Sequence, residues 1–111
     1  MAPTDDLLDK SKDRAQDQAK LEREADGERL LAGEDPSTPY AEDAKHWAGV
    51  YAELIGFKND LLERLSEDRK ALSESAMAEL ERDENLLRVE LDRLKLRLSF
   101  WETRRKELSA D

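Results

Sequence analysis

MAELERDENLLRVELDRLKLRLSFWETRRKEL, residues 77–108, is the stretch of sequence that decides the fold. Its large apolar side chains recur every seven residues, at Leu80, Leu87, Leu94, Trp101 and Leu108. Spacing of this kind is typical of the seam of a left-handed coiled coil. Residues 57–111 contain no glycine or proline, and good helix formers dominate this region. The stretch therefore predicts a long helix that packs along one face.

A second apolar stripe precedes it at three- and four-residue steps. Its members are Trp47, Val50, Tyr51, Leu54, Leu61 and Leu65. The stripe fades at residues 68–70, and a serine in the run 73–75 can cap a new helix. Folding the chain about residue 74 sets these pairs opposite each other: Trp47 and Trp101, Leu54 and Leu94, Phe57 and Leu91, Leu61 and Leu87. We therefore predict a long antiparallel, coiled-coil-like helical hairpin with its turn near residues 73–75.

The aromatic content of this hairpin predicts a further partner. One facing helix cannot cover all of its large rings, which are Trp47, Tyr51, Phe57, Phe100 and Trp101. A second copy of the hairpin covers them by forming an antiparallel four-helix bundle. We therefore expect a homodimer.

The N-terminal third differs from the rest. Residues 4–31 have helical propensity but a poor apolar face, and Thr4 is a candidate cap. Gly33 is a candidate helix stop, and Thr38 followed by Pro39 is a candidate N-cap and first helical position. We expect an acidic N-terminal helix or flexible segment with its loop over residues 1–36, loosely held, and a hairpin domain over residues 37–111. With few β-branched residues, the predicted fold class is all-α.

Composition excludes several function classes. The chain has 111 residues, 42% of them charged, and 28 acidic against 19 basic residues give a net charge of −9. That balance argues against nucleic-acid binding, and no apolar run approaches the about 20 residues that span a membrane. Cysteine is absent, which excludes disulfides. The N-terminus has no basic start followed by an apolar centre, so a signal peptide is not expected and a cytoplasmic protein is the default expectation.

Charge is also unevenly distributed. Residues 1–40 hold 11 acids and 6 bases, whereas residues 88–106 hold 7 bases and 3 acids. Cations near a helix C-terminus complement the helix dipole, which explains the basic stretch without any partner. Two alternatives are a basic docking surface and an acidic N-terminal segment lying over the basic stretch in the same molecule.

His46 is the one residue that invites a metal-site hypothesis. Glu42 and Asp43 precede it by four and three residues, so the three can share a helix face and ligate a metal. A surface histidine with a local ion pair is the simpler interpretation. We expect no metal, no cofactor and no enzyme activity, because glycine-rich phosphate loops and calcium-loop patterns are absent. A metal- or ligand-binding bundle centred on His46 remains an alternative.

Aromatic and arginine residues gather at the open end of the predicted hairpin. The candidate partner-binding residues are Tyr40, His46, Trp47, Tyr51, Phe100, Trp101, Arg104 and Arg105. Aromatic residues and arginine are enriched at binding hot spots. A core plug that closes the bundle end is the alternative, which we favour for Trp47 and Trp101. Phe100, Arg104 and Arg105 are the better contact candidates, because Phe100 falls off the seven-residue seam.

Trp47-Ala48-Gly49 also fits a Trp-x-Gly tripeptide. A chain of about this length with that tripeptide in mid-sequence resembles the WXG100 family of small secreted helical hairpins. The resemblance covers Trp47 and Gly49 only, and it implies a secreted effector or chaperone partner. We keep it as an alternative. The favoured prediction is a non-enzymatic, dimeric interaction or scaffold protein that presents helix faces, or its N-terminal segment, to a protein partner of unknown identity.

Overall fold

The structure, a computed structural model, describes residues 3–109, and within them the regular elements are all helices. Side chains are described from residue 14 onward. Three α-helices follow in order: α1 (Pro3–Ala25), α2 (Ala41–Asp68) and α3 (Glu74–Leu108). A short 3₁₀ turn, η1 (Arg69–Ala71), follows α2 directly. The all-α class and the additional N-terminal helix are thus confirmed.

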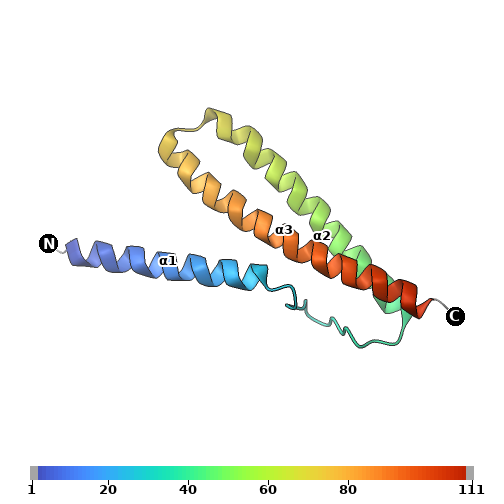
Figure 1. Ribbon diagram of the computed structural model, residues 1–111. Helices are drawn as coiled ribbons and strands as arrows, with labels where there is room; N and C mark the ends of the chain where they lie inside the picture. The colour runs from blue at the N-terminus through green and yellow to red at the C-terminus, as the bar shows by residue number, and fades with distance from the viewer. Residues whose placement is uncertain (1–2, 110–111) are drawn as a thin grey trace.

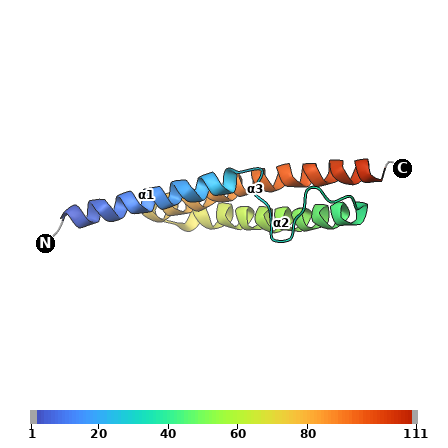
Figure 2. The same ribbon diagram turned by 90° about the horizontal axis from the view of Figure 1, so that it is seen from below.

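Helix α3 is the central element (Figure 1). It packs against α2 and, less extensively, against α1, and the two flanking helices share no comparable contact. The result is elongated and thin, with Cα extents of 70 × 32 × 15 Å (Figure 2). Within residues 3–109, no second layer of helices covers the broad faces of the molecule.

The α2–α3 seam follows the seven-residue spacing. Leu87, Leu94 and Trp101 are buried, and Leu80 and Leu108 are half-buried. Ala44, Ala48 and Tyr51 bring α2 into the same core. Small alanines at those positions let the two helices approach closely, while Trp101 and Tyr51 fill the space beside them.

Ion pairs show the register between α2 and α3. Lys58 pairs with Glu90 at 3.2 Å, and Arg69 pairs with Glu81 at 2.6 Å. Residue 58 of α2 thus lies beside residue 90 of α3, and residue 69, just after α2, lies beside residue 81 of α3. The prediction that Phe57 packs opposite Leu91 is wrong, however, because Phe57 is 60% exposed while Leu91 is buried. Phe57 lies on the outer side of α2.

The break between α2 and α3 lies slightly earlier than residues 73–75. It covers residues 69–73, and residues 74 and 75 already belong to α3. Ser73 caps α3, because its hydroxyl accepts a hydrogen bond from the Ala76 amide at 3.3 Å. A serine side chain at this position satisfies one of the free amides of the first helical turn.

Three predicted helix boundaries in residues 1–41 are wrong. Helix α1 ends at Ala25 rather than at Leu31, and its first residue, Pro3, places Thr4 inside the helix. Helix α2 has Tyr40 as its N-cap, and no side chain caps it. Thr38 instead accepts a hydrogen bond from the Tyr40 amide and donates one to Asp43 at 2.6 Å. It holds the chain just before the helix.

Residues 26–40, which we call the strap, connect α1 to α2 (Figure 1). They form turns rather than a helix, with backbone hydrogen bonds from Glu34 to Leu31 and from Thr38 to Asp35. Gly33 has a φ of 83°, in the left-handed region that favours glycine. It therefore makes the turn before Glu34 possible instead of ending a helix.

Candidate functional site

The most elaborate polar site in the described chain is built around the carboxylate of Glu34. Tyr51 Oη donates to Oε1 at 2.5 Å, and the Leu31 amide donates to the same oxygen at 2.8 Å. The other oxygen, Oε2, accepts from Arg97 Nη2 at 2.6 Å and from Trp101 Nε1 at 2.7 Å. The Glu34 side chain is fully buried. Three helical donors and one strap amide thus enclose a single carboxylate, and we call Tyr51, Arg97 and Trp101 the carboxylate site.

The electrostatics of this site keep Glu34 ionised. Burial opposes the charged form, but the hydrogen bonds from Tyr51, Leu31, Arg97 and Trp101 outweigh it, so the pKa of Glu34 lies below its usual value. Burial, followed by the hydrogen bond to Glu34, raises the pKa of Tyr51 to about 12. Burial works against the charge of Arg97, yet its bonds to Glu34 and Tyr51 leave its pKa raised. Both shifts favour the charged forms, so an ionised Glu34 faces an ionised Arg97 in this site.

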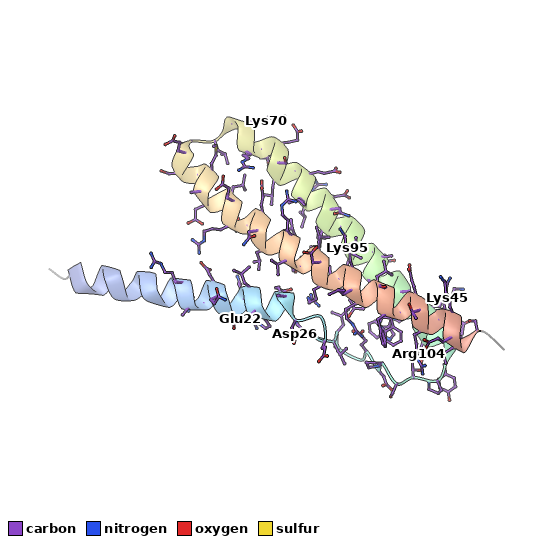
Figure 3. The ribbon with its side chains drawn as sticks, in the orientation of Figure 1. Glu22, Asp26, Lys45, Lys70, Lys95 and Arg104 are labelled. Atoms are coloured by element: carbon purple, nitrogen blue, oxygen red, sulfur yellow. The ribbon has the colours of Figure 1, made fainter. Side chains whose placement is uncertain are left out.

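Three further contacts fasten the N-terminal third to α3. Arg93 Nη2 donates to Glu24 at 3.2 Å. Arg104, which is labelled in Figure 3, donates from Nη2 to the Thr38 carbonyl at 3.1 Å. Arg82 also pairs with Asp17 of α1. The contacts of Arg93 and Arg104 agree with the alternative in which the acidic N-terminal segment lies over the basic stretch, residues 88–106. The attachment is made mostly by arginines of one helix and by oxygens of the N-terminal third.

The arginines facing the N-terminal third have donors to spare. Buried nitrogens without a hydrogen-bond partner are Arg93 Nε, Arg93 Nη1, Arg97 Nε and Arg104 Nε. Buried donors are normally paired, since each unpaired one costs on the order of 1–3 kcal/mol. This face of α3 therefore offers more donors than the chain's own oxygens use.

The predicted partner-binding residues occupy different environments. Tyr51 and Trp101 are fully buried around Glu34, and Trp47 packs against the same core while half-buried. The plug interpretation of Trp47 and Trp101 agrees with this placement. Phe100 lies at the surface, edge-on to Trp101 at 5.0 Å, with the Arg97 guanidinium 4.6 Å from its ring centre.

The remaining candidates lie nearer the surface. Tyr40, His46 and Arg105 are exposed, and Arg104 is half-buried under the strap. His46 contacts the Trp47 ring edge-on at 5.1 Å. Its proposed co-ligand Asp43 accepts a hydrogen bond from Thr38 instead. Within the described residues, no group of three or more His, Cys, Asp or Glu side chains is arranged to hold a metal ion.

A second feature is an apolar groove between α2 and α3, near the η1 end. Leucines form its floor, charged residues flank it, and we call it the α2–α3 groove. It is lined by Leu61, Arg64, Leu65, Asp68, Asp83, Leu86, Leu87 and Glu90. A smaller hollow between α1 and α3 shares Asp83 and Leu86 with it. Residues 90, 97 and 101 are spaced to share one face of α3, so the groove and the carboxylate site follow each other along that face.

Sequence reasoning did not identify Glu34. Its donors are 17, 63 and 67 residues away in the chain, so no local spacing reveals the contact. The only local signal is an acid placed directly after a glycine in a loop. Comparisons with protein families, curated sequences and solved structures find no match to this chain. In the described residues no helix has the length and apolarity required to cross a membrane.

Proposed function

We propose that this chain is a non-enzymatic helical protein–protein interaction or scaffold protein that acts as a dimer. In this proposal α2 and α3 form an antiparallel, coiled-coil-like hairpin, and two copies pair into a four-helix bundle. In this proposal the protein acts in the cytoplasm, and cell fractionation tests that location. A further protein partner binds at the aromatic–arginine end or through the N-terminal segment.

The observation that carries the proposal is apolar surface left open on a thin molecule. The α2–α3 groove leaves Leu61, Leu65 and Leu86 partly exposed above the buried Leu87. Phe57, 60% exposed, lies within one helical turn of Leu54 and Leu61. Contiguous apolar surface of this kind, rimmed by charge, is typical of interaction sites. The protein exposes 8138 Å², so a standard interface of about 800 Å² per partner is available on one broad face.

The charged rim of the groove suits pairing with a second copy. Arg64 lies beside the acids Asp68, Asp83 and Glu90. In a two-fold symmetric interface, if Arg64 of one copy meets an acid of the other, the same contact occurs twice. Leucines then meet at the centre, each Arg64 pairs with an acid of the other copy, and the remaining acids stay at the solvent-exposed edge.

Sedimentation equilibrium of the full chain tests this proposal. We expect twice the monomer mass of 12.8 kDa at micromolar concentration. Phe57→Glu should give the monomer mass with unchanged helix content, because a charge then replaces the apolar contact. Tyr40→Glu is the matched control: Tyr40 is 67% exposed but precedes the first residue of α2, whereas the groove lies near the other end of that helix, so its substitution should leave the dimer intact. A wild-type monomer at these concentrations contradicts the proposal.

A further inference from the structure

We infer that Tyr51, Arg97 and Trp101 form a recognition site for an acidic side chain of a protein partner, and that Glu34 is its intramolecular occupant. The three side chains come from α2 and α3, not from the strap. The site is therefore assembled by the helical core, and the strap only fills it. This inference goes beyond the proposed dimer, and a partner segment in the α2–α3 groove takes the place that the second copy occupies in that dimer.

The donor set is specific for a carboxylate. Arg97 and Trp101 donate to one oxygen at 2.6 and 2.7 Å, and Tyr51 donates to the other at 2.5 Å. A carboxylate has about four lone-pair positions on two oxygens and only accepts, so it matches three converging donors. A neutral amide offers one accepting oxygen and brings its own N–H donors toward the guanidinium. The site therefore distinguishes glutamate from glutamine.

Stability alone does not explain this arrangement. Buried ion pairs contribute little relative to apolar residues of similar volume, because desolvation offsets their attraction. A strap fixed by leucines would hold as well. A fully buried charge, met by an arginine, a tyrosine and a tryptophan, provides chemical selectivity instead.

The site also has capacity that the strap does not use. Arg97 Nε, Arg93 Nε and Arg93 Nη1 are buried and unpaired. Arg93 lies one helical turn from Arg97 on the same face of α3. A partner segment carrying a second acidic residue would satisfy donors that Glu24 and Glu34 leave free.

The strap has the features of a segment that can detach from the carboxylate site. It has no regular helix, and its Leu30 is 42% exposed. Leu31 packs half-buried against the core, whereas the buried positions of the strap are the polar Glu34 and Thr38. Segments with few buried apolar contacts open at a lower free energy than the whole fold. A tethered occupant acts at a high effective concentration, in the millimolar range for short flexible linkers, so a free acidic segment competes poorly while Glu34 is present.

The neighbouring groove explains how a partner overcomes this competition. Glu90, at the edge of the α2–α3 groove, precedes Arg97 by seven residues, or about 10 Å along α3. A segment with an apolar helical stripe in the groove and an acidic residue beyond it reaches both features. The partner is therefore an amphipathic segment followed by an acidic residue.

The experiment uses full-length Glu34→Ala protein and short synthetic peptides. One peptide copies residues 29–38, and a second places a single glutamate among glycines and serines; each has a twin with glutamine replacing the glutamate at the position tested. Binding is followed by the indole N–H resonance of Trp101, identified with Trp47→Phe. We expect Glu34→Ala to bind both glutamate peptides at least ten-fold more tightly than it binds their glutamine twins. We also expect the wild-type protein to bind the glutamate peptides at least ten-fold more weakly than Glu34→Ala does.

Two matched variants complete the test. Asp35→Ala, at the exposed neighbouring acid, should bind like wild type, and Tyr51→Phe combined with Glu34→Ala should weaken binding of the glutamate peptides several-fold while keeping the Trp101 reporter. Equal binding of glutamate and glutamine peptides overturns the inference. Binding of the cognate peptide alone also overturns it, because the site is then only an internal latch. If Glu34→Ala and Glu34→Gln both lose their helix content, the site does not exist without its own occupant, and the inference fails.

Discussion

Arg97 Nη2 lies 2.6 Å from the Glu34 carboxylate, across 63 residues of sequence. The Glu34 side chain is fully buried and that of Arg97 is 9% exposed. The pair joins the strap to the central helix at a place where water cannot replace either partner. Arg93 is equally buried on the same helix, but its partner Glu24 also binds Arg29 at 2.7 Å. The two arginines therefore differ in what their loss leaves behind.

We predict that Arg97→Met costs far more stability than Arg93→Met. Loss of Arg97 leaves a buried carboxylate without its counter-ion, which typically costs about 3 kcal/mol or more. Loss of Arg93 leaves Glu24 paired with Arg29, and it removes two buried unpaired donors, so its cost should stay below about 1 kcal/mol. Urea unfolding followed by circular dichroism measures both. Equal costs would show that the two pairs are equivalent.

Stability should fall at alkaline pH through Tyr51. Its pKa is raised in the folded protein to about 12, against an ordinary value of 10.0. A raised pKa means that the folded state favours the protonated form, so the contribution is complete below about pH 10 and declines as pH rises toward 12. The difference in free energy of unfolding between wild type and Tyr51→Phe should shrink over that interval. A constant difference from pH 8 to 11.5 would contradict the role of this hydroxyl.

The start of α3 should depend on Ser73. Ser73→Ala removes the hydroxyl that accepts from the Ala76 amide, and loss of such a cap costs about 1 kcal/mol. Ser75→Ala is the matched control, because Ser75 is exposed inside the first turn of α3 and has no capping role. Thermal unfolding should show a lower midpoint for Ser73→Ala alone.

Local sequence predicted the elements that depend on repeating spacing. Leu87, Leu94 and Trp101 are buried because a seven-residue repeat returns them to one side of α3. Phe57 was misplaced because a dense stripe leaves two sides of α2 apolar, and only the structure shows which one faces α3. The seam alone did not distinguish between them.

The candidate site was less predictable. Trp101 and Tyr51 were recognised as aromatic residues at one end of the molecule, but their common partner was not. Glu34 lies in a loop whose composition is polar throughout, and burial of an acid there depends on donors contributed by two distant helices. Polar contacts between residues far apart in the chain leave no periodic pattern in the sequence, so only the structure reveals them.

Glycine substitutions should have opposite effects in the strap and in α2. Gly33 has a φ of 83°, which an alanine adopts only with strain, although its Cβ would meet no atom within 4 Å. Gly33→Ala should therefore cost about 1 kcal/mol in strap stability and weaken the hold on Glu34, since the turn precedes that residue directly. Gly49 lies inside α2 with open space around it, so Gly49→Ala should stabilise the helix by about 0.5–1 kcal/mol.

Hydrogen exchange of the Leu31 and Glu34 amides reports on the strap, and thermal unfolding reports on the helices. Faster exchange in Gly33→Ala, together with slower or unchanged exchange in Gly49→Ala, would separate backbone strain from a general effect of added methyl groups. The same sign for both substitutions would show that the left-handed turn does not position Glu34.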